Sequence, residues 1–204
     1  MTTHLTYARD DFRPNDESQI FDCIEQYSFA TLISDREGGP QISHLPMLLD
    51  REARKLIGHM ARANPQWEHA QQGKVLCVFN GPHAYISPTW YEEQDVVPTW
   101  NYVAVHVRGP LNITHDDQAT LDILRRYVAF YETGLSSPWS VDEADASFIR
   151  KLSQQTVAFE ISIEHLEGIW KLSQHHSDAR RQKVVAALES QQSENAQAIA
   201  KLMR

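Results

Sequence analysis

Short stretches of alternating apolar residues constrain the fold of this chain more than any other feature. Val103, Val105 and Val107 alternate with other residues in WNYVAVHVRGP, and VAFEISI alternates in the same way from Val157 to Ile163. A period of two places one set of side chains on one face of a strand. At least six short strands are expected in all, without the repeated strand–helix alternation of a parallel sheet. We therefore expect a mainly β fold with helices (α+β), built on an antiparallel sheet.

Turn signals divide these runs. REGGP separates FATLISD from QISHLPMLLD, which predicts a hairpin, and a turn near DREAR leads into KLIGHMA. Gly81–Pro82 and Gly109–Pro110 are predicted to end the strands KVLCVFN and WNYVAVHVR.

Helices are expected between and after the strands. The first begins at Asn15 or Asp16 and runs to about Tyr27, and Asn64–Pro65 opens a short helix with Asn64 as cap. Further helices are predicted over residues 116–133, 142–152 and 177–204, the last of them capped by Ser177 or Asp178. In the helix over residues 116–133 the spacing assigns one apolar face to Leu121, Leu124, Val128 and Tyr131.

The composition is that of an ordinary globular protein. The chain has 204 residues, of which 42% are hydrophobic and 23% charged, so we expect one domain over residues 1–204 with a helical extension over about 177–204. No apolar run reaches the roughly 18 residues of a membrane span, and the first residues lack a signal-peptide pattern, so a cytoplasmic location is expected. Cys23 and Cys77 form no paired motif and are predicted to be core thiols.

The charge disfavours unspecific binding to nucleic acid. The net charge is −8, and DNA affinity depends largely on Lys and Arg contacts to phosphates. Residues 171–204 carry 6 basic and 3 acidic side chains, so DNA contact is possible there but weakly supported.

Polar and aromatic residues concentrate in three stretches: HMARANPQW at residues 59–67, GPHAYISPTWY at 81–91 and PTWNY at 98–102. Aromatic planes suit a flat ring system, and an Arg near a helix start suits a phosphate. This pattern favours a planar phosphorylated ligand, with a core or dimer contact as the alternative.

Together with KLSQ at residues 171–174, these motifs resemble the PaiB-type family of FMN-binding negative transcriptional regulators over nearly the whole chain. The resemblance implies a split β-barrel of the pyridoxamine-phosphate-oxidase type with peripheral helices, a homodimer, and FMN held between the subunits. It places the backbone of His59, Met60 and Ala61 along the isoalloxazine ring, with Arg62 and Asn64 near the phosphate.

The resemblance also assigns residues outside that strand. Lys171 and Gln174 complete the flavin pocket, and Trp100, Asn101 and Tyr102 reach it from the partner subunit. The family continues KLSQ with Asn and then Arg, whereas this chain has His175 and His176. A protonated His176 would compensate for the missing cation.

Other polar residues have simpler interpretations. His44 is expected to be structural, and turn geometry accounts for the residues around His83 and Tyr85. The sequence has no HExxH motif, cysteine knuckle or spaced His/carboxylate triad, so no metal site is predicted. A Rossmann-type glycine loop is also missing.

Three functions remain open. A transcriptional regulator follows the family, but the one candidate recognition helix, SDARRQKVVAALES, presents only a mixed basic face. An FMN-dependent oxidoreductase acting on an unknown small molecule is the second, because flavins supply hydride and electron chemistry, although no catalytic residue is identified. A flavin store or interaction module is the third.

Overall fold

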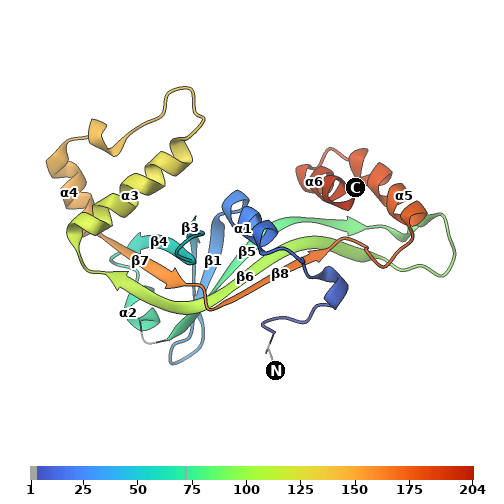
Figure 1. Cartoon of the computed structure of the whole chain (residues 1–204), viewed down its shortest axis with the longest axis horizontal. Helices are drawn as coiled ribbons and strands as arrows, with labels where there is room; N and C mark the ends of the chain where they lie inside the picture. The colour runs from blue at the N-terminus through green and yellow to red at the C-terminus, as the bar shows by residue number, and fades with distance from the viewer. Residues whose placement is uncertain (1–3, 72) are drawn as a thin grey trace. The chain divides into compact units, whose positions relative to one another are not determined.

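The computed structural model describes residues 4–71 and 73–204 and consists of strands with helices before, between and after them (Figure 1). The strands are β1 (Phe29–Ser34), β2 (Gln41–Pro46), β3 (Leu48–Asp50), β4 (Lys55–Ala61), β5 (Lys74–Ile86), β6 (Thr99–Thr114), β7 (Thr156–Ser162) and β8 (His165–Lys171). The α-helices are α1 (Glu17–Gln26), α2 (Gln66–Ala70), α3 (Asp117–Glu132), α4 (Ala146–Gln154), α5 (Asp178–Glu189) and α6 (Glu194–Met203). Single 3₁₀ turns are η1 (Asp10–Phe12), η2 (Pro88–Tyr91) and η3 (Val141–Glu143).

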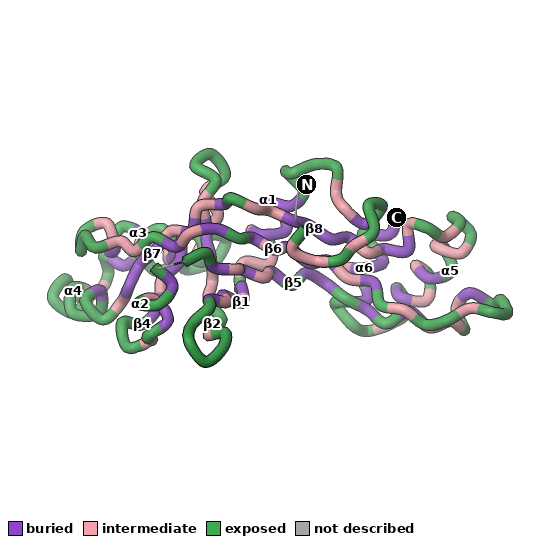
Figure 2. Tube along the Cα trace, turned by 90° about the horizontal axis from the view of Figure 1, so that it is seen from below, coloured by how far each residue is buried: buried purple, intermediate pink, exposed green. Residues whose placement is uncertain are grey.

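The strands form one sheet in the order β2-β1-β5-β6-β7-β4-β3, with β8 paired to β6. The predicted hairpin is confirmed: Phe29 of β1 pairs with Pro46 of β2 in an antiparallel register. The pairs β1–β5, β3–β4, β4–β7 and β6–β7 are also antiparallel. The mainly β class expected from the alternating runs is therefore confirmed, and Figure 2 shows buried residues running along the strands.

The two Gly-Pro pairs do not end strands, contrary to the prediction. β5 runs through Gly81–Pro82 and β6 runs through Gly109–Pro110. A Cβ on Gly81 would lie 2.9 Å from the Cβ of Val103, and one on Gly109 would lie 1.7 Å from the carbonyl oxygen of Ser162. These glycines allow two backbones to approach closely, which is the other common reason for glycine in a strand.

The chain divides into two compact units that interleave along the sequence. Unit 1 contains residues 1–27, 79–106 and 167–204, and unit 2 contains residues 28–78 and 107–166. β5 and β6 each continue from one unit into the other. The assignment of residues 1–204 to a single domain stays a prediction.

In unit 2 the sheet curls back on itself, because β2 also contacts β4. One side is covered by α3, whose Thr120, Ile123 and Tyr127 are buried. The predicted apolar face of this helix was therefore wrong by about one position, and Tyr131 is 42% exposed. The Tyr127 hydroxyl fixes the rotation of the helix, since it lies 2.8 Å from the carbonyl oxygen of Pro46 and 2.6 Å from that of Ile57.

In unit 1 the helix α1 begins as expected, with the Asp16 side chain accepting a hydrogen bond from the Ser18 amide. Ser177 caps α5 in the same way, also as expected. The C-terminal segment is two helices rather than one, because Ser193 caps a separate helix α6.

The remaining helix predictions hold with small shifts. The Asn64 side chain accepts a hydrogen bond from the Gln66 amide, but α2 starts at Gln66, so Pro65 precedes the helix rather than opening it. The expected helix over residues 142–152 is η3 followed by α4.

Burial raises the pKa of both Cys23 and Cys77 to about 12, which confirms them as core thiols. None of the helices within residues 4–71 and 73–204 combines the length and apolarity that a membrane span needs.

Candidate ligand-binding site

The end of β4, in unit 2, carries the first group of predicted site residues. Met60 is 2% exposed and belongs to the core, whereas Ala61 is exposed and His59 is half-buried. The His59 ring meets the Tyr127 ring edge-on, with centroids 4.5 Å apart. Burial lowers the pKa of His59, and its buried Nδ1 has no hydrogen-bond partner among the described residues. The strand end therefore offers a neutral imidazole with an unused polar atom.

Arg62 follows directly and is already partly engaged. Its Nε donates to the carbonyl oxygen of Gln154 at 2.7 Å, and one terminal nitrogen donates to that of Thr156 at 3.0 Å. These bonds hold the guanidinium at the C-terminal end of α4. Because arginine has five N–H donors, the group keeps donors for a phosphate.

Asn64 has a mainly local role in the structure. Its amide nitrogen donates to Ser43 Oγ at 2.9 Å, and its oxygen accepts from the Gln66 amide at 3.0 Å. The residue thus joins β2 to the start of α2.

In unit 1 the predicted residues on β6 differ in exposure. Trp100 is 50% exposed, and its ring lies 5.5 Å from the ring of His83 and 6.1 Å from that of Tyr85, centroid to centroid. Tyr85 is 47% exposed. The three rings form an exposed aromatic platform, but the His83 and Tyr85 rings are inclined by 47° and 70° to the Trp100 ring, so a flat molecule can stack on only one ring at a time.

Asn101, in contrast, is completely buried. Its oxygen accepts from Ser173 Oγ at 3.1 Å, and its amide nitrogen donates to Met203 Sδ at 3.2 Å. It connects β6 to the segment after β8 and to the end of α6.

The segment KLSQ forms a tight turn at the end of β8. Gln174 accepts from the Leu172 amide at 2.7 Å and donates to the carbonyl oxygen of Trp170, while Ser173 has a φ of 60°. Lys171 points away from this turn and donates to Thr99 Oγ1 at 2.8 Å. Gln174 therefore shapes the segment, and Lys171 is the residue that it presents.

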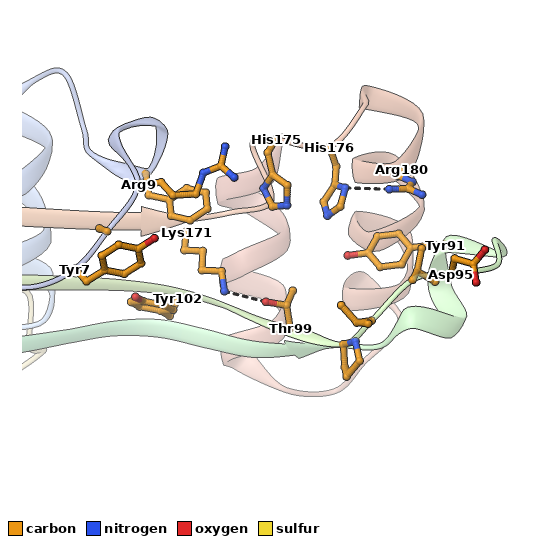
Figure 3. Close-up of a pocket in the computed structure, with 15 residues that line it drawn as sticks. Tyr7, Arg9, Tyr91, Asp95, Thr99, Tyr102, Lys171, His175, His176 and Arg180 are labelled. Atoms are coloured by element: carbon orange, nitrogen blue, oxygen red, sulfur yellow. Dashed lines mark hydrogen bonds between the residues drawn. The ribbon is translucent and has the colours of Figure 1, made fainter.

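Lys171 and Tyr102 line a cavity of about 520 Å³ that lies entirely within unit 1 (Figure 3). The other lining residues are Tyr7, Ala8, Arg9, Phe12, Tyr91, residues 95–99, His175, His176 and Arg180. Hereafter we call this space the unit 1 cavity. Its aromatic walls and its basic residues suit an anionic ligand of moderate size.

The imidazoles at the cavity are neutral near pH 7. The His175 and His176 rings lie 4.1 Å apart, centroid to centroid. Burial lowers the pKa of both, and neighbouring cations add to the effect: Arg9 for His175, and Arg180, together with His175, for His176. Protonated His176 as a substitute for the family's cation is therefore disfavoured.

Arg180 is a cation whose charge is already balanced. Its Nε lies 3.0 Å from each carboxylate oxygen of Glu93, and this bonding raises the pKa of Arg180 and lowers that of Glu93. It therefore contributes little net charge to the cavity.

The buried carboxylate of Glu167 holds the N-terminal segment that forms part of the cavity wall. Glu167, 5% exposed, accepts from the amides of Leu5 and Thr6 at 2.9 and 3.2 Å and lies 2.6 Å from His4 Nδ1. Arg13 adds a contact at 3.3 Å. Burial alone raises the pKa of Glu167, but these bonds and charges outweigh it and hold the pKa below its usual range. The network fixes the segment that carries Tyr7 and Arg9.

Sequence reasoning found Lys171 and Tyr102 and placed Tyr91 in an aromatic stretch without a role, but it missed Tyr7, Arg9 and Phe12. The His4–Glu167 contact that positions the N-terminal segment joins residues 163 positions apart in the sequence, and no local sequence pattern predicts it.

Comparison with known proteins shows that the sequence matches a protein family. Residues 6–165 match the family described as "Putative FMN-binding domain". The protease synthase and sporulation protein PAI 2 of Bacillus subtilis is 31% identical over 195 residues, which cover 94% of this chain and 93% of the relative. An uncharacterized protein of Emericella nidulans is 32% identical over 203 residues, covering 80% of this chain and 81% of the relative.

Solved structures agree on the fold. The flavocytochrome Anf3 of Azotobacter vinelandii superposes with a TM-score of 0.63 at 12% identity, covering 82% of this chain and 74% of its own. An FAD and heme binding protein of Mycobacterium smegmatis gives 0.61 at 15% identity, covering 78% and 73%. The expected split-barrel, flavin-binding type of fold is confirmed.

Proposed function

This chain belongs to the FMN-binding domain family, and from that premise we propose that it works as a homodimer that holds FMN between its subunits. FMN is the cofactor of the family, as the sequence motifs predicted. The observation that carries the proposal is Arg62, an exposed guanidinium with donors left after its bonds to the end of α4.

The residues present suit such a ligand. Arg62 would hold the phosphate, and the unpartnered Nδ1 of His59 would meet a polar atom of the ring system. The half-exposed Trp100 platform would contact the ring from the partner subunit, with Tyr102 and Lys171 beside it. Asn64, Asn101 and Gln174 would support these segments, because their own polar atoms are used within the chain.

Bound FMN supplies hydride and electron chemistry, and the protein supplies its position and surroundings. The chain's own contribution at the unit 1 cavity would be binding and orientation. Neutral His175 and His176 can donate or accept there, and Lys171 provides a fixed positive charge.

An action on transcription, if the relative's sporulation role extends to this chain, would be indirect. The three cations of α5 are engaged within unit 1: Arg180 forms a salt bridge with Glu93, Lys183 forms one with Glu92 at 2.9 Å, and Arg181 donates to the carbonyl oxygen of Met203. A recognition helix needs such side chains free for bases and phosphates. We therefore propose regulation through FMN or a small-molecule ligand, rather than through base reading by α5.

The oxidoreductase stands as a second candidate because of the unit 1 cavity, which is large enough for a small substrate. Anaerobic addition of NADH or NADPH separates the two candidates. Bleaching of the flavin absorbance favours the enzyme, and an unchanged spectrum favours the regulator.

Mixed dimers test the shared site. One subunit carries Arg62→Ala and the other Trp100→Ala, each with a different tag, and the doubly tagged dimer is purified. If the flavin is held by Arg62 of one subunit and Trp100 of its partner, one of the two sites in this dimer is intact. Titration should then give one tight FMN per dimer.

Each parent homodimer, in contrast, should bind FMN weakly at both sites. If both residues serve the same subunit, every site in the mixed dimer carries one defect and no tight site remains. A protein that sediments as a monomer with FMN bound would also overturn the proposal.

A further inference from the structure

We propose that the unit 1 cavity binds a small aromatic anion, a carboxylate or a phosphate ester, with Lys171 and Tyr91 contacting its charged group. Lys171 and Tyr102 are shared with the proposed flavin site, so the inference deepens the proposed function by naming the class of its second ligand. It rests on that function for the ligand's purpose, while binding itself can be tested without FMN.

The shape and the walls of the cavity suit a ring. Its volume of about 520 Å³ falls within the range of small-molecule sites, roughly 300–1,000 Å³. Tyr7, Phe12 and Tyr102 supply aromatic surfaces from different segments of unit 1. Such walls favour a planar apolar body over a flexible polar one.

The charge of the cavity selects an anion. Lys171 is half-buried, donates to the neutral hydroxyl of Thr99, and forms no salt bridge with any residue in the described part of the chain. The other two lining cations are compensated, Arg180 by Glu93 and Arg9 by Asp11 at 2.9 Å. Asp95 is the one acidic residue of the described lining, and it is exposed. Lys171 is thus a positive charge without a counterion.

Tyr91 gives the second, independent indication of a ligand. The residue is 2% exposed, and its hydroxyl has no partner in good hydrogen-bond geometry among the described residues, although the Ser173 side chain lies close enough to lower the pKa of Tyr91 against the rise that burial causes. Figure 3 shows this hydroxyl pointing toward the space bordered by His176 and Thr99. Its neighbour Ser173 donates instead to Asn101. A buried hydroxyl without a partner is costly, and an oxygen of a bound anion would satisfy it.

Calorimetry on FMN-free protein tests the inference, with benzoate and phenyl phosphate as probes and benzyl alcohol as the neutral control. At least one anion should bind saturably with one site per chain, and benzyl alcohol should bind at least 10-fold more weakly. Tyr91→Phe and Lys171→Gln should each weaken the anion about 10-fold. The matched controls Tyr131→Phe and Lys201→Gln, outside the cavity, should leave the affinity unchanged.

Tyr91→Phe also separates a ligand contact from a structural role. The hydroxyl has no well-aligned hydrogen bond within the described part of the chain, so its removal should leave the melting temperature unchanged or raise it. A lowered melting temperature, or unchanged anion affinity, would overturn the assignment of Tyr91. Absence of saturable binding for both anions would overturn the inference as a whole.

Competition with FMN distinguishes this inference from the proposed function. Stoichiometric displacement of the probe by FMN would show that the cavity is the flavin's own pocket, which refutes a second ligand and leaves FMN binding intact. Simultaneous binding of FMN and probe supports both. Binding of the probe by a protein that ignores FMN would refute the proposed function and support the anion site.

Discussion

Replacing Arg62 by Ala should weaken FMN far more than riboflavin, which lacks the phosphate. In the structure two N–H groups of Arg62 bond the carbonyl oxygens of Gln154 and Thr156, so the phosphate would receive donors from the remaining three. Hydrogen bonds between charged groups contribute about 1.5–3 kcal/mol. At about 1.4 kcal/mol per tenfold, FMN affinity should fall roughly 10- to 100-fold relative to riboflavin.

The comparison of two ligands removes the structural part of the effect. Arg62→Ala also deletes two bonds at the end of α4, which we expect to lower stability by about 1 kcal/mol. That loss acts on the protein before either ligand binds, so it affects both affinities equally. The ratio of the two dissociation constants therefore reports the phosphate contact alone.

Quenching of flavin fluorescence measures both constants on the same preparation. Arg36→Ala serves as the matched control, because Arg36 is exposed and lies in the β1–β2 turn, outside residues 59–64. We expect it to change neither constant by more than about twofold. An equal loss of FMN and riboflavin in Arg62→Ala would show that the arginine supports the fold and does not hold the phosphate.

Three further predictions concern the scaffold. Glu167→Gln should lower the free energy of unfolding in urea by about 2 kcal/mol at pH 7, because charge-assisted bonds to residues 4–13 are lost, whereas exposed Glu52→Gln should have little effect. The folded state lowers the pKa of Glu167, so the stability that its carboxylate contributes should be fully present above the pKa of the unfolded chain, near 4.3, and should be lost as the pH falls through the lower pKa of the folded state. If the free energies of unfolding of wild type and Glu167→Gln differ by the same amount at every pH, this reasoning is contradicted. Gly109→Ala should lower the free energy of unfolding by about 3 kcal/mol or more, because its Cβ would overlap the backbone of β7. Gly73→Ala should leave the free energy of unfolding nearly unchanged, because a Cβ there meets nothing within 4 Å. Tyr127→Phe should cost about 1–2 kcal/mol in thermal unfolding, and an unchanged melting temperature would mean that its hydroxyl does not anchor α3.

Local signals predicted the elements of this fold well. The alternation of Val103, Val105 and Val107 gave a real strand, and the side chains of Asp16 and Ser177 do cap helices. These features depend on neighbours in sequence. Gly109 was misread because its role depends on Ser162, a partner from a distant strand that no local pattern reveals.

The candidate site was predicted only in part for the same reason. The motif residues form recognisable polar and aromatic clusters in the sequence, but the sequence does not show which of their polar atoms form hydrogen bonds within the protein. Asn101 is buried against Ser173 and Met203, whereas Lys171 remains available. Tyr91 was grouped with an aromatic stretch, and only its burial without a partner singles it out.

The last turn of α6 has a practical consequence for handling the protein. Met203 is 2% exposed, its sulfur accepts from Asn101, and its carbonyl oxygen accepts from Arg181. Proteolytic loss of Met203 would leave the buried side-chain amide of Asn101 without the sulfur that accepts its hydrogen bond. Preparations that lose ligand affinity during storage should therefore be checked for their mass before any other explanation is sought.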